Sequence, residues 1–435
     1  AGEHCAQQLS GADVVIVNSC SVTAEADRQA RAFIRRAHRA NPAAKIVVTG
    51  CYAQRAPQEL ACLPGVAAVI GNSHKALAPQ IVLSLAGSGV GPDPTAPESL
   101  ASVQSLLAGG APVWADDRFA HSFIAEAELV PAAQTRPNLK IQEGCGNRCT
   151  FCVIPTTRGP SKSLPHAVLM RKVEGFAAAG GNELVLSGIN LGRWGRDLSE
   201  PRCTLASLVR AILEQTALPR LRLSSIEPMD WDSDLISLMA EFGGRRLARH
   251  AHLPLQSGSD AVLRRMHRRY RPWHYAGKID ALLRAAGPDL TVGADVMVGF
   301  PGETAAEFEE TLAFVGALPF AYLHLFPFSP RPGTPGWALH TQSPVEPAVT
   351  EERMAALRAL AAEKSKAHRR RFIGRALDAI TLHTTAALVA RGRTSALTEN
   401  FLPVELEGDV PANRLLAVRV TGLNAEGALE GSQLP

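Results

Sequence analysis

Three cysteines within one short stretch carry the most definite chemistry of this chain. Cys145, Cys149 and Cys152 follow the spacing C-x3-C-x2-C. Three thiolates at this spacing can ligate three irons of a cubane [4Fe–4S] cluster, which leaves the fourth iron without a protein ligand. A zinc knuckle is the alternative, but zinc prefers four ligands in two pairs, and no fourth Cys or His follows at the expected distance. The pattern therefore predicts a cluster with one open, reactive iron.

Two further cysteines lie at the ends of predicted strands. The β-branched run Val14–Val17 ends just before Cys20, a helix is expected over 23–40, and the strand Lys45–Thr49 ends just before Cys51. This order predicts a βαβ unit with a parallel sheet. Adjacent parallel strands lie about 4.8 Å apart, so the two thiols can reach one metal site. The alternative is two loop cysteines without a function.

The residues around the three-cysteine motif resemble those of a known family. Phe151, the aromatic residue directly before Cys152, is similar to the signature of radical S-adenosylmethionine (SAM) enzymes, and the segment CVIPTTRG at 152–159 resembles the methylthiotransferases among them. The resemblance implies that SAM chelates the open iron through its amino acid end. It also implies that the electron that splits SAM reaches this cluster from a donor such as flavodoxin or ferredoxin.

The methylthiotransferases also hold a second [4Fe–4S] cluster, on three cysteines of their N-terminal domain. The resemblance implies that Cys20 and Cys51 are two of these ligands, and that the first ligand lies one strand and helix earlier. Cys5 precedes Cys20 by only fifteen residues, so we do not expect it to be that ligand. We expect instead that the first strand and the third ligand are missing from this chain. Cys62 and Cys203 are assigned no role.

Six strand signals alternate with helical patterns in the middle of the chain. The strands are expected at 139–142, 184–186, 221–224, 250–253, 292–298 and 322–326. Such alternation predicts an α/β fold with a parallel sheet, and six repeats are fewer than the eight of a complete TIM barrel. A partial (β/α)6 barrel is what the radical SAM resemblance implies.

Function in such a barrel is expected at the carboxyl ends of its strands. Gly188 and Asn190 follow the second strand, Glu227 follows the third, and Gln256 follows the fourth. By position we expect these four residues near SAM or the substrate base. Asp295 lies inside a strand instead, where we expect it to be buried and paired.

Composition bounds the remaining organisation. A chain of 435 residues with 46% hydrophobic residues predicts two to four domains. It opens without a signal segment and has no apolar run that could span a membrane, which indicates a reducing, cytoplasmic compartment. We expect a βαβ domain over 1–85, a Gly/Pro-rich linker over 86–134, the barrel over 135–368 and a small all-β barrel over 369–435. The last resembles the OB-like TRAM domain that methylthiotransferases use on RNA.

A net charge of only +4 means that any RNA-binding surface must be local. The stretch 245–275 holds eight Arg and four His against one acid, with Tyr270, Trp273 and Tyr275 interleaved, and Arg264, Arg265, Arg268 and Arg269 are expected to project outward. This pattern fits either a solvated helical face or a surface that grips RNA. The TRAM-like segment is nearly balanced, with eight basic and seven acidic residues from Arg369.

The resemblance implies methylthio insertion at C2 of a modified adenosine at position 37, in a tRNA anticodon stem-loop. A radical is needed because that C–H bond is not acidic and the ring offers no leaving group. Residues 20–28 and 223–228 resemble the branch that acts on N6-threonylcarbamoyladenosine. The competitors are the branches acting on N6-isopentenyladenosine or on a ribosomal-protein aspartate, a radical SAM enzyme of other outcome, and an RNA-binding protein with a structural metal.

Overall fold

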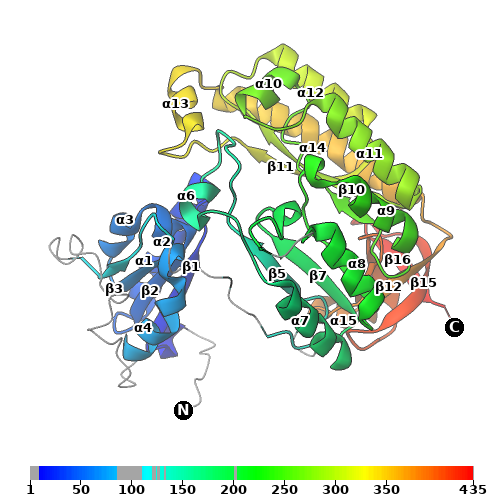
Figure 1. Cartoon of the computed structure of the whole chain (residues 1–435), viewed down its shortest axis with the longest axis horizontal. Coiled ribbons are helices and arrows are strands. Elements are labelled where there is room, and N and C mark those ends of the chain that lie inside the picture. Colours follow the sequence, from blue (N-terminus) through cyan, green and yellow to red (C-terminus); the bar gives the residue numbers. More distant parts are fainter. Residues whose placement is uncertain are drawn as a thin grey trace. The chain divides into compact units, whose positions relative to one another are not determined.

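A computed structural model of the chain describes residues 9–85, 110–119, 124, 128–131, 134–199 and 203–434. Cys5 and most of the predicted linker lie outside these residues. The chain divides into two compact units, each described here by itself (Figure 1). The first comprises 1–125, 144–160 and 329–338, and the second comprises 126–143, 161–328 and 339–435. No helix in the described ranges is long and apolar enough to cross a membrane.

The first unit is built on a parallel sheet with the strand order β1-β2-β3-β4. Its strands are β1 (Val14–Ser19), β2 (Lys45–Gly50), β3 (Val66–Gly71) and β4 (Val113–Trp114). Helices α1 (Ala24–Ala40) and α3 (Pro57–Ala61) cover one face and α4 (Ala78–Leu85) covers the other, because Ile34 and Leu60 join one hydrophobic cluster and Ile81 joins another. The predicted βαβ unit is confirmed, whereas β4 lies in the predicted linker and was not expected.

Two segments distant in sequence complete the first unit. One is the 144–160 loop, which ends in the short helix α6 (Ile154–Arg158), and the other is 329–338. The backbone N–H of Gly336 donates to the carbonyl of Thr150 over 2.7 Å. Arg331 donates to the Ser21 hydroxyl over 2.9 Å and pairs with the buried carboxylate of Asp27. Segment 329–338 thereby fastens the residues after β1 and the 144–160 loop within the same unit.

The second unit begins with six parallel strands in two sheets. They are β5 (Asn138–Glu143), β7 (Glu183–Gly188) and β8 (Arg220–Leu223), and β9 (His250–His252), β10 (Thr291–Val298) and β11 (Phe320–Pro327). The sheets adjoin where the N–H of Ile226 donates to the carbonyl of His252 over 3.0 Å. The short strand β6 (Lys162–Ser163) pairs antiparallel with β5. All six predicted strands are therefore confirmed, and they form a partial barrel.

Helices cover the outside of this partial barrel (Figure 1). They are α7 (His166–Ala178), α8 (Leu205–Gln215), α9 (Ser233–Phe242), α10 (Asp260–Arg265), α11 (Pro272–Ala286), α12 (Ala305–Ala317) and α14 (Pro347–Arg370). Apolar residues of the strands face these helices: Val292, Ala294 and Val296 of β10 are fully buried. Asp295, which alternates with Ala294 and Val296, lies on the inside.

A closed five-stranded barrel ends the chain, with the order β12-β13-β14-β16-β15. Its elements are β12 (Ala376–Thr381), α15 (Ala386–Val389), β13 (Arg393–Thr398), β14 (Pro403–Glu407), β15 (Leu415–Leu423) and β16 (Leu429–Gln433). The predicted all-β segment is confirmed. Its turn between β13 and β14 contacts the parallel barrel, because Arg222 donates to the carbonyl of Thr398 and Arg249 pairs with Glu399.

Candidate functional site

The three-cysteine motif lies on the 144–160 loop of the first unit. The loop closes on itself where the N–H of Cys145 donates to the carbonyl of Gly159 over 3.1 Å. Gly144 starts it with φ +71°, and a Cβ there would lie 2.0 Å from the Pro160 carbonyl oxygen. A side chain at this position would meet rigid backbone, so only glycine lets the chain turn into the motif.

The thiols of this loop suit an iron–sulfur cluster. Cys145, Cys149 and Cys152 are each partly exposed, and none forms a disulfide with another described cysteine. Cys145 Sγ accepts the N–H of Asn147 and Cys152 Sγ accepts the N–H of Ile154, both over 3.4 Å. Such N–H···S bonds stabilise thiolate ligands and tune the cluster they hold. The donor set therefore fits a cluster with three protein ligands.

Cys20 and Cys51 follow neighbouring strands of the first unit at matched positions. Ser19 of β1 pairs with Gly50 of β2, and each cysteine comes next in the chain. Cys20 is exposed, whereas Cys51 is buried as the first residue of α2 (Cys51–Arg55). The predicted geometry, two thiols at the same edge of a parallel sheet, is confirmed.

Cys51 has two nitrogen donors that the sequence interpretation left unassigned. Arg158 Nε donates to Cys51 Sγ over 3.1 Å, and Asn72 Nδ2 lies 3.6 Å from the same sulfur. Asn72 also donates to the carbonyl of Thr157 over 2.8 Å. Arg158 and Thr157 belong to the loop that carries the three-cysteine motif, so the two candidate cluster segments touch within one unit. A cation beside a thiol favours its thiolate form.

The other candidates from the sequence lie in the second unit. Gly188 ends β7, and Asn190 follows it with its N–H on Gln142 Oε1 over 2.7 Å. Gln256 is buried with φ +65°, and its Oε1 has no hydrogen-bond partner among the described residues. A strained, buried amide with an unused acceptor is typical of a ligand-binding position.

The expectation that four arginines after Gln256 project outward is wrong for Arg268. Its side chain is buried and pairs with Glu227, the remaining candidate. Tyr270 and Tyr275 are also fully buried, so of the three interleaved aromatic residues only Trp273 is exposed. Arg268 is drawn inward because Glu227 offers a carboxylate there, which the helical period alone does not reveal. The stretch keeps Arg264, Arg269 and Trp273 on the surface, whereas its two tyrosines pack inside.

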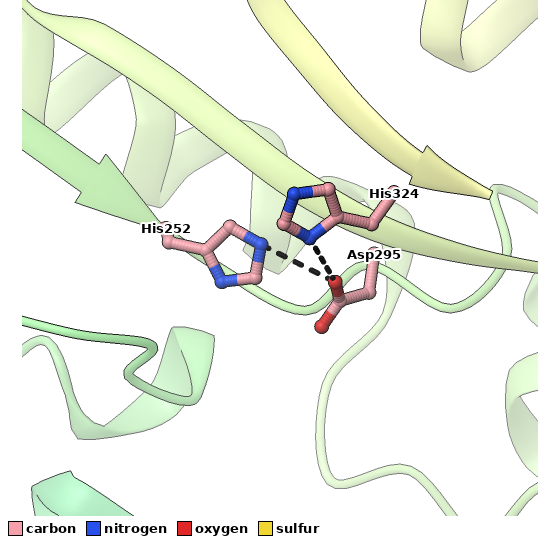
Figure 2. Close-up of side chains that lie close together, drawn as sticks. All are labelled: His252, Asp295 and His324. Atoms are coloured by element: carbon pink, nitrogen blue, oxygen red, sulfur yellow. Dashed lines mark hydrogen bonds and ion pairs between the residues drawn. The ribbon is translucent and has the colours of Figure 1, made fainter. Parts of the chain in front are cut away.

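A cluster of polar side chains lies on the inner face of the partial barrel (Figure 2). Asp295 Oδ1 lies 3.3 Å from His252 Nε2 and 3.2 Å from His324 Nδ1. Burial alone would raise the pKa of Asp295, but the two histidines outweigh burial and lower it. The expectation that Asp295 is paired is thus confirmed. His324 itself is largely exposed, with 64% of its side chain accessible.

Charged groups continue this inner face toward the start of the strands. Glu183 is fully buried and binds Arg222 Nε over 2.8 Å and Arg136 Nε over 2.7 Å, while Arg220 lies 3.4 Å away. Burial would raise the pKa of Glu183, but the three guanidinium groups lower it to about 2. Three cations thus share one fully buried anion, and the carboxylates of Glu399 and Asp378 also act on Arg220.

Sequence interpretation missed these residues, although a signal was present. Polar and apolar residues alternate in β8 (Arg220, Arg222), in β9 (His250, His252) and in β11 (Tyr322, His324). Strands of a parallel barrel are ordinarily apolar on both faces. Polar side chains at every second position therefore indicate that this inner face is not packed as a hydrophobic core and is open to a ligand.

Comparisons with known proteins agree with this arrangement. The family model described as the radical SAM superfamily matches residues 139–315, and that of the uncharacterized protein family UPF0004 matches residues 1–71. The threonylcarbamoyladenosine tRNA methylthiotransferase MtaB of Bacillus subtilis is 33% identical over 91% of this chain and 82% of its own length. The tRNA-2-methylthio-N(6)-dimethylallyladenosine synthase of Cereibacter sphaeroides is also 33% identical, over 97% of this chain and 90% of its own length.

One solved structure shares the fold. The radical SAM methyltransferase TsrM of Kitasatospora setae, solved with cobalamin and a [4Fe–4S] cluster bound, matches with a TM-score of 0.51 and 16% identity. The match covers 76% of this chain and 67% of that chain. At this identity the similarity concerns the chain's architecture alone.

Proposed function

Because the chain belongs to the radical SAM tRNA methylthiotransferase family, we propose that it inserts a methylthio group at C2 of N6-threonylcarbamoyladenosine at position 37 of tRNA. The observation that carries the reaction type is the pair of cysteine sites in the first unit, joined by the Arg158–Cys51 contact. A radical SAM enzyme of other outcome would need only the three-cysteine loop.

Cys145, Cys149 and Cys152 hold the first [4Fe–4S] cluster in this proposal. These three thiols would leave one iron open to SAM, and a cluster held there would, with an electron from a flavodoxin or ferredoxin, supply the radical chemistry needed at the unactivated C2–H bond. Gly144 and the Cys145–Gly159 hydrogen bond hold the three thiols in position. Phe151, beside the last thiol, and Gly188, Asn190, Glu227 and Gln256, after the strands of the partial barrel, are assigned to SAM and the base.

Cys20 and Cys51 are two ligands of a second [4Fe–4S] cluster, from which the inserted sulfur comes. Arg158 and Asn72 assist by donating to Cys51 Sγ, which orients that sulfur. Residues 1–85 then form the sulfur-donating domain, 135–368 the radical domain, and 369–435 a TRAM-like domain that binds the RNA backbone near the anticodon stem-loop. Residues 86–134 connect these two domains along the sequence, and β4 within them joins the sheet of the first unit.

The choice of nucleoside rests on the polarity of the inner face. A threonylcarbamoyl group carries a carboxylate, whereas a dimethylallyl group is wholly apolar. An inner face with three arginines and two histidines beside Glu183 and Asp295 suits the former, because burying an apolar group against charged side chains would desolvate them without compensation. Relatives named for the dimethylallyl substrate make that nucleoside the second candidate.

The proposal predicts different losses in two cysteine variants. Cys149→Ala should abolish SAM cleavage, because two thiolates no longer hold the first cluster. Cys51→Ala should still cleave SAM but should add no sulfur to RNA. Nucleoside mass spectrometry of tRNA from a strain lacking the native gene, complemented with each variant, measures the modification. Production of 5′-deoxyadenosine in vitro measures the cleavage.

Cys62→Ala is the matched control, since Cys62 is an exposed thiol of the same unit at the end of α3 and should behave as wild type. If Cys51→Ala retains full methylthiolation, the second cluster is assigned to the wrong residues. If wild-type protein modifies only dimethylallyl-bearing tRNA, the choice of nucleoside is wrong.

A further inference from the structure

His324 is an exposed imidazole beside the half-buried Asp295 and Tyr322. It lies on β11 opposite Asp295 of β10, and its Nδ1 contacts the Asp295 carboxylate over 3.2 Å (Figure 2). In a doubly protonated ring, Nδ1–H donates to this carboxylate and Nε2–H lies on the opposite side of the ring, where an anion can accept it. Because the side chain is 64% exposed, a ligand can reach it.

Aromatic neighbours hold this imidazole in place. The ring centroid of His324 lies 5.2 Å from that of Tyr322 and 5.3 Å from that of His252. Tyr322 is fixed in turn by a 2.7 Å hydrogen bond to His250. A carboxylate and two rings already hold this imidazole in one orientation. It therefore loses little conformational entropy when a ligand binds. His324 is therefore positioned before any ligand arrives.

The charge around His324 favours an anion. Arg222 is buried over the ring of Phe401, which packs against Tyr322, and its Nη1 has no hydrogen-bond partner in the described part of the chain. The carboxylate nearest to Arg222, that of Glu183, is already shared among three arginines. Asp295 is paired with His252 and His324, on the Nδ1 side of the His324 ring. Because the Arg222 side chain is only 2% exposed, it acts on a ligand at His324 through its charge and not by contact.

We infer that His324 binds the carboxylate of the N6 substituent of adenosine 37 and thereby selects an anionic over an apolar substituent. Asp295 is a positioning residue for His324, and the arginines around Glu183 supply the positive field. This inference rests on the proposed function, since it names the residue that reads the threonyl group. It adds a specificity determinant that the cysteine sites do not provide.

The test uses three anticodon stem-loop RNAs with the full-length, cluster-loaded enzyme. One carries N6-threonylcarbamoyladenosine at position 37, one carries its methyl ester, which removes only the negative charge, and one carries N6-dimethylallyladenosine. The readout is kcat/KM for methylthiolation of each RNA. Wild type should prefer the free acid over the ester by about 10-fold to 100-fold, as expected for a hydrogen bond to a charged group.

His324→Ala should lower kcat/KM for the free acid and remove the preference over the ester. His324→Gln retains a side-chain donor and should keep part of the preference for the acid. This second variant tests the inference even if the alanine variant folds poorly. His274→Ala is the matched control, because His274 is an exposed histidine on the outer helix α11 and should keep the full preference.

Three results separate the possible failures. If His324→Ala keeps the wild-type preference for the acid, the inference is wrong while the proposed function stands. If wild type acts on the dimethylallyl RNA and not on the free acid, the proposed function fails as well. His252, Asp295 and His324 also place ligand atoms within 4.8 Å of one another, as a divalent cation requires. Stoichiometric zinc or manganese in wild type that His324→Ala loses would make this a metal site and overturn the inference.

Discussion

At the scale of single residues, the loop that carries the three cysteines depends on its backbone conformation as much as on the thiols themselves. The three-cysteine spacing predicts the ligands, but the loop exists because Gly144 and Gly159 both adopt positive φ and bracket the motif. Arg158, four residues before β6 begins at Lys162, reaches Cys51 across 107 positions of sequence. Spacing within a motif cannot reveal a partner so distant.

Replacing Gly144 tests whether the backbone holds the cluster loop. Gly144→Ala should lower the iron and sulfide bound per chain, because its Cβ would overlap the Pro160 carbonyl and would force an alanine into φ +71°. Such a position destabilises the loop by more than about 1 kcal/mol. Iron and labile sulfide after anaerobic reconstitution provide the measurement.

Gly146→Ala is the control within the same loop, since a Cβ there would meet nothing within 4 Å. It should bind as much iron as wild type. Equal iron in both variants would mean that the loop adapts to a side chain at 144, and that the glycine is not needed for cluster assembly.

At the scale of elements, periodicity predicted nearly all that positions the site. The six strands of the partial barrel and the helix expected over 23–40 lie where their patterns indicated, and Thr23 caps that helix. Periodicity could not predict contacts between residues far apart in sequence. Arg268 turns inward because it pairs with Glu227, and the two-residue strand β4 forms because it pairs with β3.

The helix α14 supports the barrel through a buried histidine near its end. His368 Nε2 lies 3.0 Å from Thr291 Oγ1 at the start of β10, and its ring packs edge-on against Phe372. Burial, with the charges of Arg371 and Arg369, lowers the pKa of His368 from 6.5 to about 4. The folded protein therefore holds His368 neutral at pH values where the unfolded chain would protonate it.

This difference predicts a pH dependence of stability. Between about pH 6.5 and pH 4 the unfolded state binds more protons at His368, so the contribution of His368 is fully present above pH 6.5 and is lost as the pH falls. From pH 7 to pH 5.5 the free energy of unfolding should drop by about 1 kcal/mol more in wild type than in His368→Gln. Urea unfolding at the two pH values measures it, and identical drops would contradict the assignment. Buried His250, also with a lowered pKa, is present in both proteins and cancels.

At the scale of the whole molecule, the second unit joins two barrels through one turn. Phe401, with φ +68°, stacks on His250 with ring centroids 4.2 Å apart, and Arg222 lies over its ring. The β-rich tail was predicted from its alternating runs, but its strands β13 and β16 and its attachment to the parallel barrel were not. The TRAM-like barrel therefore contributes to the inner face that the proposed substrate would meet.

The ion pair between Arg249 and Glu399 is expected to hold this attachment. Glu399 is buried, and its carboxylate accepts Arg249 Nε over 2.8 Å and the Arg249 N–H over 3.0 Å. Glu399→Gln leaves a partly buried guanidinium with only Asp289, at 3.3 Å, as its anion. Removing one partner of a buried pair costs about 3–5 kcal/mol, and the remaining aspartate should reduce this to about 2 kcal/mol.

Glu407→Gln is the control, because Glu407 lies on the adjacent strand of the same small barrel and pairs with Arg393 at 3.8 Å on the surface. This variant removes an equal charge and should change the free energy of unfolding by less than about 0.5 kcal/mol. Urea unfolding followed by circular dichroism compares the two variants. Because the turn couples the barrels, wild type should lose both in one transition, and Glu399→Gln should lower the midpoint or separate the small barrel as an earlier step. Equal midpoints for the two variants would mean that the barrels are held together by apolar contacts around Phe401, and that the ion pair contributes no net stability.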